Sequence, residues 1–266
     1  MLGLRVSETE PLAPSAAPNQ GLASSLVSVL ACTPPEPGSD DERRGVYRAI
    51  YERRDVRSRF IAASLPGEVL ARILDAAHHA PSVGFMQPWE FIVITDGLVR
   101  RAVREQFEDT NRRAAAAYDG DRRDRYDRLK LEAIIDSAVN LCVTCDPTVA
   151  RGHGLGRQTM PETAIYSAVC AIQNCWLAAR AEGVGVGWVS IVEVDAIRRI
   201  LAIPAHLVIV GYLCLGYVSG FDAEPELAAR GWEHRVPLAE VMHFDRYGAV
   251  DPLRAQALVQ TMATGA

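Results

Sequence analysis

The strongest indication of the fold comes from residues 163–181, which have the sequence TAIYSAVCAIQNCWLAARA. Small and apolar side chains fill most positions, and Glu182-Gly183 follows as a helix-ending signal. A helix that is apolar on most faces is buried inside its domain. We therefore expect this segment to be the central helix of the protein.

Short β-branched segments lie on both sides of this helix and predict strands. The expected strands cover residues 90–95 (EFIVIT), 139–145, 185–191 and 207–218. Further helices are expected after Ser64 and at about 98–117, 121–136 and 194–201. The pair at 98–136 is rich in Arg with little apolar surface to bury, so we expect it to form a mobile lid.

The N-terminal part divides near residue 38. Residues 1–38 are rich in Pro, Ala and Ser, which predicts a disordered extension. Ser39-Asp40-Asp41-Glu42 then has a capping-box pattern that starts a helix. No boundary stands out within residues 39–266, and helices dominate over dispersed strands. We therefore predict one α+β domain for this part.

Composition excludes several classes of protein. The chain has 266 residues, 49% of them hydrophobic, so a wholly disordered chain is excluded. Its net charge of −5 argues against a general nucleic-acid binder, although a local anion site stays possible. No apolar run reaches the roughly 20 residues of a membrane helix, so we expect a cytoplasmic protein without membrane contact. The six scattered cysteines predict reduced thiols.

Two motifs suggest metal or nucleotide chemistry but fit structural roles better. Cys142 and Cys145 have the spacing of a zinc or redox pair, yet residues three apart on a strand point to opposite faces. The glycines at 183, 185 and 187 miss the dinucleotide fingerprint because position 188 is Trp. They predict either a tight turn or a backbone that lets a flat ring approach closely. We expect no metal site.

Two basic features allow a ligand-binding interpretation. Residues 53–57, RRDVR, are either a solvated helix end or a phosphate site, since Arg presents a fork of donors to phosphate oxygens. Asp55 is the anomaly in a phosphate site, because a carboxylate repels an anion. Lys130 is the single lysine among 28 basic residues. It is either a chance survivor or a group needed as a compact ammonium.

Residues 81–89, PSVGFMQPW, taken with RRDVR and the strand that follows, resemble the FMN-binding nitroreductase fold over about residues 43–240. Nitroreductases usually carry Asn where Phe85 stands. Five motifs in order, RRDVR, GFMQPW, LKLE around Lys130, GVGWVS and GW-x-x-R, resemble one branch in particular. That branch is the 5,6-dimethylbenzimidazole synthase family.

The resemblance implies a three-layer α+β sandwich with a mixed, mainly antiparallel sheet flanked by helices. It also implies a homodimer, with FMN at the subunit interface and a C-terminal arm on the partner subunit. The family fragments reduced FMN with O2 into 5,6-dimethylbenzimidazole, the lower ligand of cobalamin, and erythrose 4-phosphate. Such a reaction needs a separate NAD(P)H-dependent flavin reductase.

The family motifs imply roles for individual residues. Asp55 and Ser190 match the two catalytic positions, and Lys130 reaches toward the polar edge of the flavin. Arginines hold the phosphate and ribityl region, while the 82–87 loop lines the flavin. The implied FMN-binding positions are Arg53, Arg54, Asp55, Val56, Arg57, Ser82, Gln87, Lys130, Gly187, Val189, Ser190 and Arg235.

Two other classes of function stay open on the sequence. The first is an ordinary FMN-dependent nitroreductase or flavin reductase that oxidises NAD(P)H. Phe85 and Asp55 argue against it. The second is a non-catalytic protein that binds or stores flavin.

Overall fold

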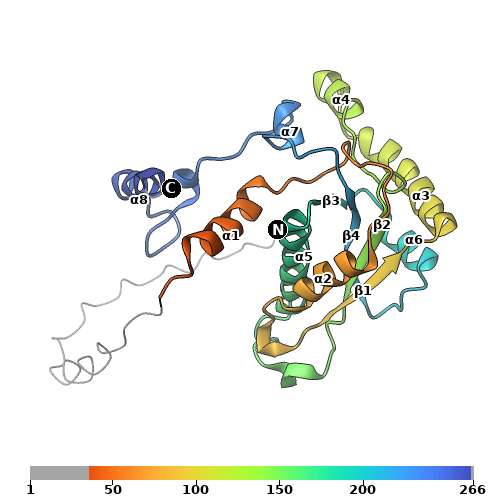
Figure 1. Ribbon diagram of the computed structural model, residues 1–266, viewed down its shortest axis with the longest axis horizontal. Helices are drawn as coiled ribbons and strands as arrows, with labels where there is room; N and C mark the ends of the chain where they lie inside the picture. Colours follow the sequence, from red (N-terminus) through yellow and green to blue (C-terminus); the bar gives the residue numbers. More distant parts are fainter. Residues whose placement is uncertain (1–35, 265–266) are drawn as a thin grey trace, which may run out of the picture. The chain divides into compact units, whose positions relative to one another are not determined.

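The four strands form one antiparallel sheet with the order β1-β2-β4-β3 in the computed structural model (Figure 1). The structure describes residues 36–264. The strands are β1 (Trp89–Ile94), β2 (Val139–Cys145), β3 (Val184–Val189) and β4 (Val208–Tyr217). All four were expected from the sequence, β3 as a Gly-rich strand. A short parallel bridge between Asp55 and Val186 extends the sheet beyond β3 and makes it mixed.

Helices cover both faces of the sheet, which gives the three layers expected (Figure 1). The longer helices are α1 (Asp40–Glu52), α2 (Gly67–His78), α3 (Gly97–Ala115), α5 (Thr163–Ala181) and α8 (Pro252–Thr264). Shorter ones are α4 (Gly120–Asp127), α6 (Val194–Ile200) and α7 (Glu226–Ala229). Single 3₁₀ turns occur at η2 (Val83–Phe85), η3 (Arg151–Gly154) and η4 (Leu238–Val241).

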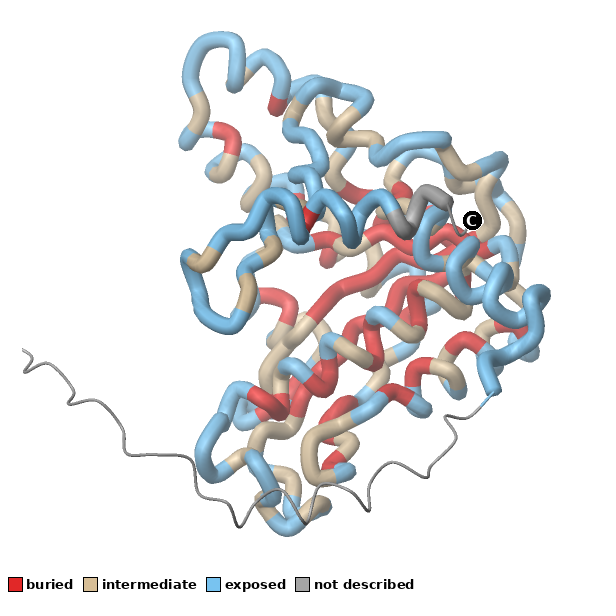
Figure 2. The backbone as a smooth tube through the Cα atoms, turned by 90° about the vertical axis from the view of Figure 1, so that its left-hand side faces the viewer, coloured by how far each residue is buried: buried red, intermediate tan, exposed pale blue. Residues whose placement is uncertain are grey.

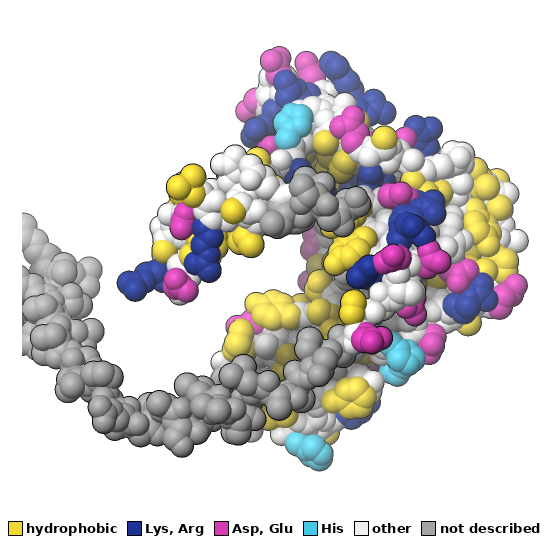
Figure 3. Space-filling view, turned by 60° about the vertical axis from the view of Figure 1, so that its left-hand side comes forward, with side chains coloured by type: hydrophobic (Ala, Val, Ile, Leu, Met, Phe, Trp, Pro, Cys, Tyr) yellow, Lys and Arg dark blue, Asp and Glu magenta, His cyan; other side chains and the backbone are white. Residues whose placement is uncertain are grey.

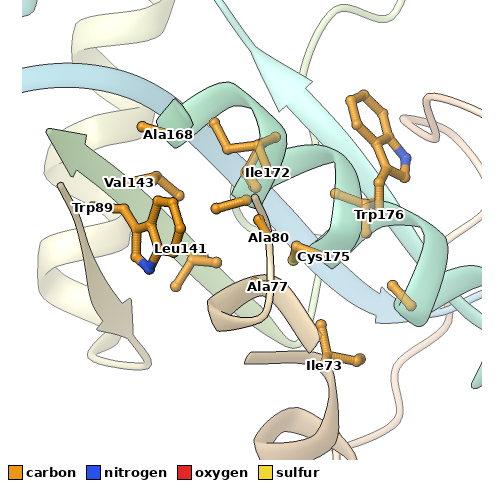
Figure 4. Close-up of a cluster of buried hydrophobic side chains, with 14 of the residues drawn as sticks. Ile73, Ala77, Ala80, Trp89, Leu141, Val143, Ala168, Ile172, Cys175 and Trp176 are labelled. Carbon is orange, nitrogen blue, oxygen red and sulfur yellow. The ribbon is translucent and has the colours of Figure 1, made fainter. Parts of the chain in front are cut away.

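The first core lies between the sheet and the layer of α2 and α5. Helix α5 contacts all four strands, as expected of a central helix. It contributes Ala168, Ile172 and Cys175, while α2 contributes Ile73 and Ala77 (Figure 4). The small residues of α5 let α2 pack closely against it. Figure 2 shows the buried residues concentrated in the strands and in α5.

The second core lies on the opposite face, beneath α3 and α6. Val103 and Phe107 of α3 are buried there beside Ile197 of α6. The Arg-rich helix expected at 98–117 thus has a narrow buried face, while most of its other residues are exposed or half-buried. Val103 and Phe107 are four residues apart, so both fall on the face toward the sheet, and Ala115 is buried as well. The helix expected at 121–136 is also shorter than expected and ends at Asp127.

The two cysteines of the CxxC motif point into different cores. Cys145 belongs to the cluster under α5, and Cys142 belongs to the cluster under α3. This confirms the strand argument, because alternate residues of β2 face opposite sides of the sheet. Burial raises the pKa of Cys142 to about 12 and that of Cys145 to about 11. Both thiols are thus neutral packing groups.

Helix α1 begins at Asp40, directly after Ser39, but none of its residues is buried. Exposed hydrophobic side chains on it include Val46, Tyr47 and Tyr51, whose face the sequence spacing defines. Figure 3 shows further uncovered hydrophobic patches on one side of the chain. Residues 42–264 form one compact unit. Of the extension expected at residues 1–38, residues 1–35 lie outside the described part of the chain. Across residues 36–264, every helix is too short or too polar for a membrane span.

Candidate flavin site

The residues after α1 run alongside the exposed edge of β3. The Val56 amide donates to the Val186 carbonyl at 2.9 Å, across the parallel bridge made by Asp55. A side chain at position 187 is excluded, because its Cβ would lie 2.2 Å from the Val56 carbonyl oxygen. The glycine at 187 therefore admits a neighbouring segment of the chain. Neither a tight turn nor a bound ring is needed to explain it.

Asp55 is held by two donors. The Trp188 amide donates to Oδ1 at 2.9 Å, and the Arg57 guanidinium pairs with Oδ2. Burial nevertheless raises the pKa of Asp55 above its ordinary value, and these two partners only partly oppose it. A raised pKa lets a carboxyl group hold a proton at higher pH than an ordinary Asp does. Such a group is suited to proton transfer.

Arg57 and Arg53 are half-buried cations whose charges act on Asp55. The side chain of Arg57 is 11% exposed, and its Nε is buried with no hydrogen-bond partner among the described residues. The Arg53 guanidinium lies over the Trp176 ring at 4.8 Å from the centroid. Burial is the main cause that lowers the pKa of Arg53, and the positive charge of Arg235 contributes. The distal Arg235 thus lies near enough for its charge to act on the 53–57 segment.

Arg54 has a different environment from its neighbours. Its guanidinium donates to the carbonyls of Asp222 and Tyr51 at 2.9 and 2.8 Å, and also to that of Ala223. These bonds attach the 53–57 segment to the chain that follows β4. The structure therefore gives Arg54 carbonyl partners, and its implied phosphate contact stays a prediction.

Ser190 and Val189 lie at the end of β3. Ser190 is exposed and follows Trp188 by two residues, or about 7 Å along an extended chain. Because Trp188 contacts Asp55, the two implied catalytic residues lie at the same end of β3. Val189 is 2% exposed and packs in the second core. Its side chain faces the protein interior, so only its backbone is placed to contact a ligand.

The loop that carries Ser82 and Gln87 lies along another part of α5. The Ser82 hydroxyl accepts a hydrogen bond from the Gln87 amide at 3.1 Å, and the Val83 amide donates to the Ser167 hydroxyl. Ser167 and Trp176 are nine residues apart on α5, which corresponds to about 13.5 Å. Among the contacts of the described residues, none joins this loop to the 53–57 segment.

Lys130 lies apart from both groups. It forms an ion pair with Asp136 on the chain between α4 and β2. Lys130 lines a surface pocket together with Arg104 and Glu132. The implied flavin contact of Lys130 stays a prediction, since no contact within residues 36–264 connects Lys130 to Asp55.

The tail motif at 231–235 packs on the same chain. The Trp232 ring lies 5.4 Å from Tyr118 and 6.2 Å from Tyr126 between centroids. Arg125 donates to the Gly231 carbonyl at 3.1 Å. The tail was expected to pack along another surface, and for residues 231–232 that surface includes α4.

Sequence reasoning missed the role of Trp176 and Arg151. Trp176 lies in the helix that the sequence predicts to be buried, and its ring face supports Arg53. Arg151 lies in a glycine-rich loop and donates to the Gln87 carbonyl at 2.7 Å. Neither has a spacing signal, because each contact joins segments that are far apart in the chain.

Comparison with known proteins identifies the family of this chain. The Nitroreductase family profile matches residues 50–217. The chain is 43% identical to the 5,6-dimethylbenzimidazole synthase of Rhodospirillum rubrum, covering 73% of this chain and 92% of the relative. A synthase of the same name from Rhodobacter capsulatus is 37% identical, covering 73% and 94%.

Solved structures share the fold. Iodotyrosine deiodinase bound to FMN and 3-iodo-L-tyrosine has a TM-score of 0.61 at 18% identity, covering 76% of this chain and 100% of that one. A nitroreductase family protein of Clostridium difficile has a TM-score of 0.55 at 20% identity, covering 75% and 97%. The chain belongs to the Nitroreductase family and, within it, to the branch of the 5,6-dimethylbenzimidazole synthases.

Proposed function

We propose that this protein converts reduced FMN and O2 into 5,6-dimethylbenzimidazole and erythrose 4-phosphate, and so supplies the lower ligand of cobalamin. The single observation that carries the proposal is Asp55, a carboxyl with a raised pKa placed within a cluster of arginines. A site that only held a phosphate would gain nothing from a negative charge there. The two relatives described above are named 5,6-dimethylbenzimidazole synthase, which supports the same product.

The donors of this site fit FMN. The phosphate is an anion, and Arg57 offers a buried Nε that lacks an acceptor among the described residues. Arg53 is supported from below by an aromatic ring, and the charge of Arg235 acts on it. Arginine forks match phosphate oxygens in shape and charge. We assign the phosphate and ribityl chain to this cluster.

The side chains of the protein have separate tasks in this proposal. Reduced FMN together with O2 supplies the oxidative chemistry and the carbon skeleton of the product. Asp55 holds or moves a proton, and the Trp188 amide with Arg57 fixes its orientation. The Ser190 hydroxyl, at the same end of β3, is a second hydrogen-bonding group for the reacting region. The apolar Phe85 ring excludes water where a nitroreductase usually offers an amide.

We also propose that the protein acts as a homodimer with FMN at the subunit interface. Two observations support this. Among the described residues, no hydrogen bond or ion pair joins the Ser82–Gln87 loop to the arginine cluster, and this separation suits a flavin site that a second copy of the chain completes. Helix α1 has exposed hydrophobic residues and no buried ones, which suits a partner subunit. The C-terminal arm on the partner subunit belongs to the same proposal.

Reduced FMN must come from another enzyme, because the protein consumes its flavin. We therefore assign an NAD(P)H-dependent flavin reductase as the partner in a cytoplasmic reaction. The test is anaerobic incubation with chemically reduced FMN, followed by air and mass spectrometry for 5,6-dimethylbenzimidazole. Bound flavin with NAD(P)H oxidation and no product would identify a nitroreductase or flavin reductase. Bound flavin without any turnover would identify a storage protein.

A further inference from the structure

The loop that carries Gln87 has an unusual backbone. Three residues in a row of four have positive φ angles: Gly84 at 60°, Phe85 at 54° and Gln87 at 45°. Glycine adopts this region freely, but Phe85 and Gln87 have a Cβ that disfavours it. Such a conformation persists only where the surrounding structure holds it. Something must therefore stabilise residues 85–87 in this form.

Local hydrogen bonds hold only part of this loop. The Phe85 amide donates to the Ser82 carbonyl at 3.0 Å, and the Met86 amide donates to the Val83 carbonyl at 3.2 Å. These bonds form the turn and leave the carbonyls of residues 86 and 87 for other donors. Arg151 supplies both donors: its Nε donates to the Met86 carbonyl at 3.2 Å and its terminal nitrogen to that of Gln87 at 2.7 Å.

The loop that carries Arg151 interlocks with the Gln87 loop, and the two lie side by side in Figure 1. A Cβ at Gly152 would lie 2.4 Å from the Gly84 carbonyl oxygen. A Cβ at Gly84 would lie 2.9 Å from the Leu155 carbonyl oxygen. The backbones thus touch directly, which brings the Arg151 guanidinium to a fixed place beside the strained residues.

We propose that Arg151 is a positioning residue of the flavin site. By holding two successive carbonyls it fixes the left-handed backbone of Gln87 and the direction of the neighbouring Phe85 ring, which is 76% exposed. The proposal rests on the proposed function, since it takes Gln87 and Phe85 as flavin-facing groups. A purely structural Arg151 would stabilise the fold without a special effect on this loop.

Arg157 offers a matched control. It lies in the same excursion between β2 and α5 and donates from one guanidinium to two backbone carbonyls, those of Pro147 and Val149, both at 2.9 Å. Among the hydrogen bonds of the described residues, it has none to the 82–87 loop. Arg157→Ala therefore removes the same charge and the same kind of bond without touching Gln87.

The experiment compares Arg151→Ala, Arg151→Lys and Arg157→Ala in the full chain. Hydrogen–deuterium exchange without flavin measures the amides of residues 85–87, and a fluorescence titration measures the Kd of FMN. Arg151→Ala is expected to speed exchange there and raise the Kd, each by about tenfold, the effect of losing charged hydrogen bonds. Arg151→Lys reaches only one carbonyl and should give an intermediate Kd.

Arg157→Ala should leave exchange at residues 85–87 and the Kd within about twofold of wild type. Equal changes in both alanine variants, or unchanged exchange in Arg151→Ala, would overturn the positioning role. A wild-type protein that does not bind FMN would count against the proposed function instead. The exchange measurement separates these two failures, because it needs no flavin.

Discussion

Replacing Asp55 by Asn is the sharpest test of the proposed chemistry. Asn keeps the size of the side chain and an oxygen that accepts from the Trp188 amide, which lies 2.9 Å from Oδ1. It removes the ion pair with Arg57, whose Nε has no hydrogen-bond partner among the described residues. The change therefore removes a charge and a proton-binding group while it preserves most of the shape.

The cost to folding follows from the Arg57 contact. Leaving a buried charged donor without its acceptor costs about 1–3 kcal/mol. Because 30% of the Asp55 side chain is exposed, water replaces part of the loss, and removal of the unfavourably buried carboxylate offsets more of it, so we expect a cost of at most about 1–2 kcal/mol. That limit corresponds to a fall in Tm of no more than about 8 °C for a chain of this size. The variant should stay folded.

Binding and turnover should separate in Asp55→Asn. FMN should bind as tightly as in the wild type or more tightly, because a negative charge near the phosphate is gone. Product formation should fall by about 10²- to 10⁴-fold, the usual contribution of a positioned acid or base. The assay is 5,6-dimethylbenzimidazole formed per reduced FMN consumed in air, beside a flavin titration.

A matched control is Asp222→Asn. The Asp222 side chain pairs with Arg59 at the surface, and its contact with Arg54 is made by the backbone carbonyl, which Asn keeps, so the product yield should be unchanged. A wild-type yield in Asp55→Asn would show that the catalytic assignment is wrong. A loss of FMN affinity with unchanged turnover of bound FMN would make Asp55 a binding group.

The raised pKa of Asp55 also has a consequence for stability. The folded protein binds this proton more tightly than the unfolded chain, whose Asp titrates near 3.8. Stability from this group is present at low pH and is lost as pH rises from there through the folded pKa. Asp55→Asn does not lose stability in this way, because Asn has no proton to release. The stability of Asp55→Asn relative to wild type should therefore increase across that window in urea titrations at a series of pH values.

Three further variants test other parts of the site. Ser190→Ala should keep the Kd of FMN within about tenfold of the wild-type value, since one hydrogen bond contributes about 0.5–1.5 kcal/mol, but it should lower the product yield per FMN consumed. An unchanged yield would show that Ser190 has no part in the mechanism. Lys130→Arg should lower turnover more than an Arg→Lys change at an exposed position, because a planar guanidinium does not replace a compact ammonium. Wild-type turnover in Lys130→Arg would show that Lys130 is not a flavin contact. Gly187→Ala places a Cβ 2.2 Å from the Val56 carbonyl oxygen, so it should destabilise the protein by about 1–3 kcal/mol in urea unfolding and weaken FMN binding. An unfolding midpoint equal to that of the wild type would contradict the close approach.

The elements with strong local patterns were predicted well. The central helix and β2 begin and end at the expected residues, 163–181 and 139–145. The buried face of α2 follows its apolar spacing, with Ile73 and Ala77 at its centre. These features depend on residues that are close together in the chain, so periodicity and end signals are enough to locate them. The family motifs likewise identified the branch before any contact was known.

Other features were decided by contacts between distant segments. The Arg-rich helix α3 buries Val103, Phe107 and Ala115, and only the tertiary structure shows what they pack against. The glycine at 187 is required by a carbonyl more than 130 residues earlier, and the raised pKa of Asp55 depends on burial that no local pattern reports. Local patterns therefore determined most of the elements and the α+β class, and the resemblance of the motifs indicated the layers and the family of this protein. The tertiary structure alone decided how Asp55 is held and that Arg151 supports Gln87, because hydrogen bonds and desolvation act through space.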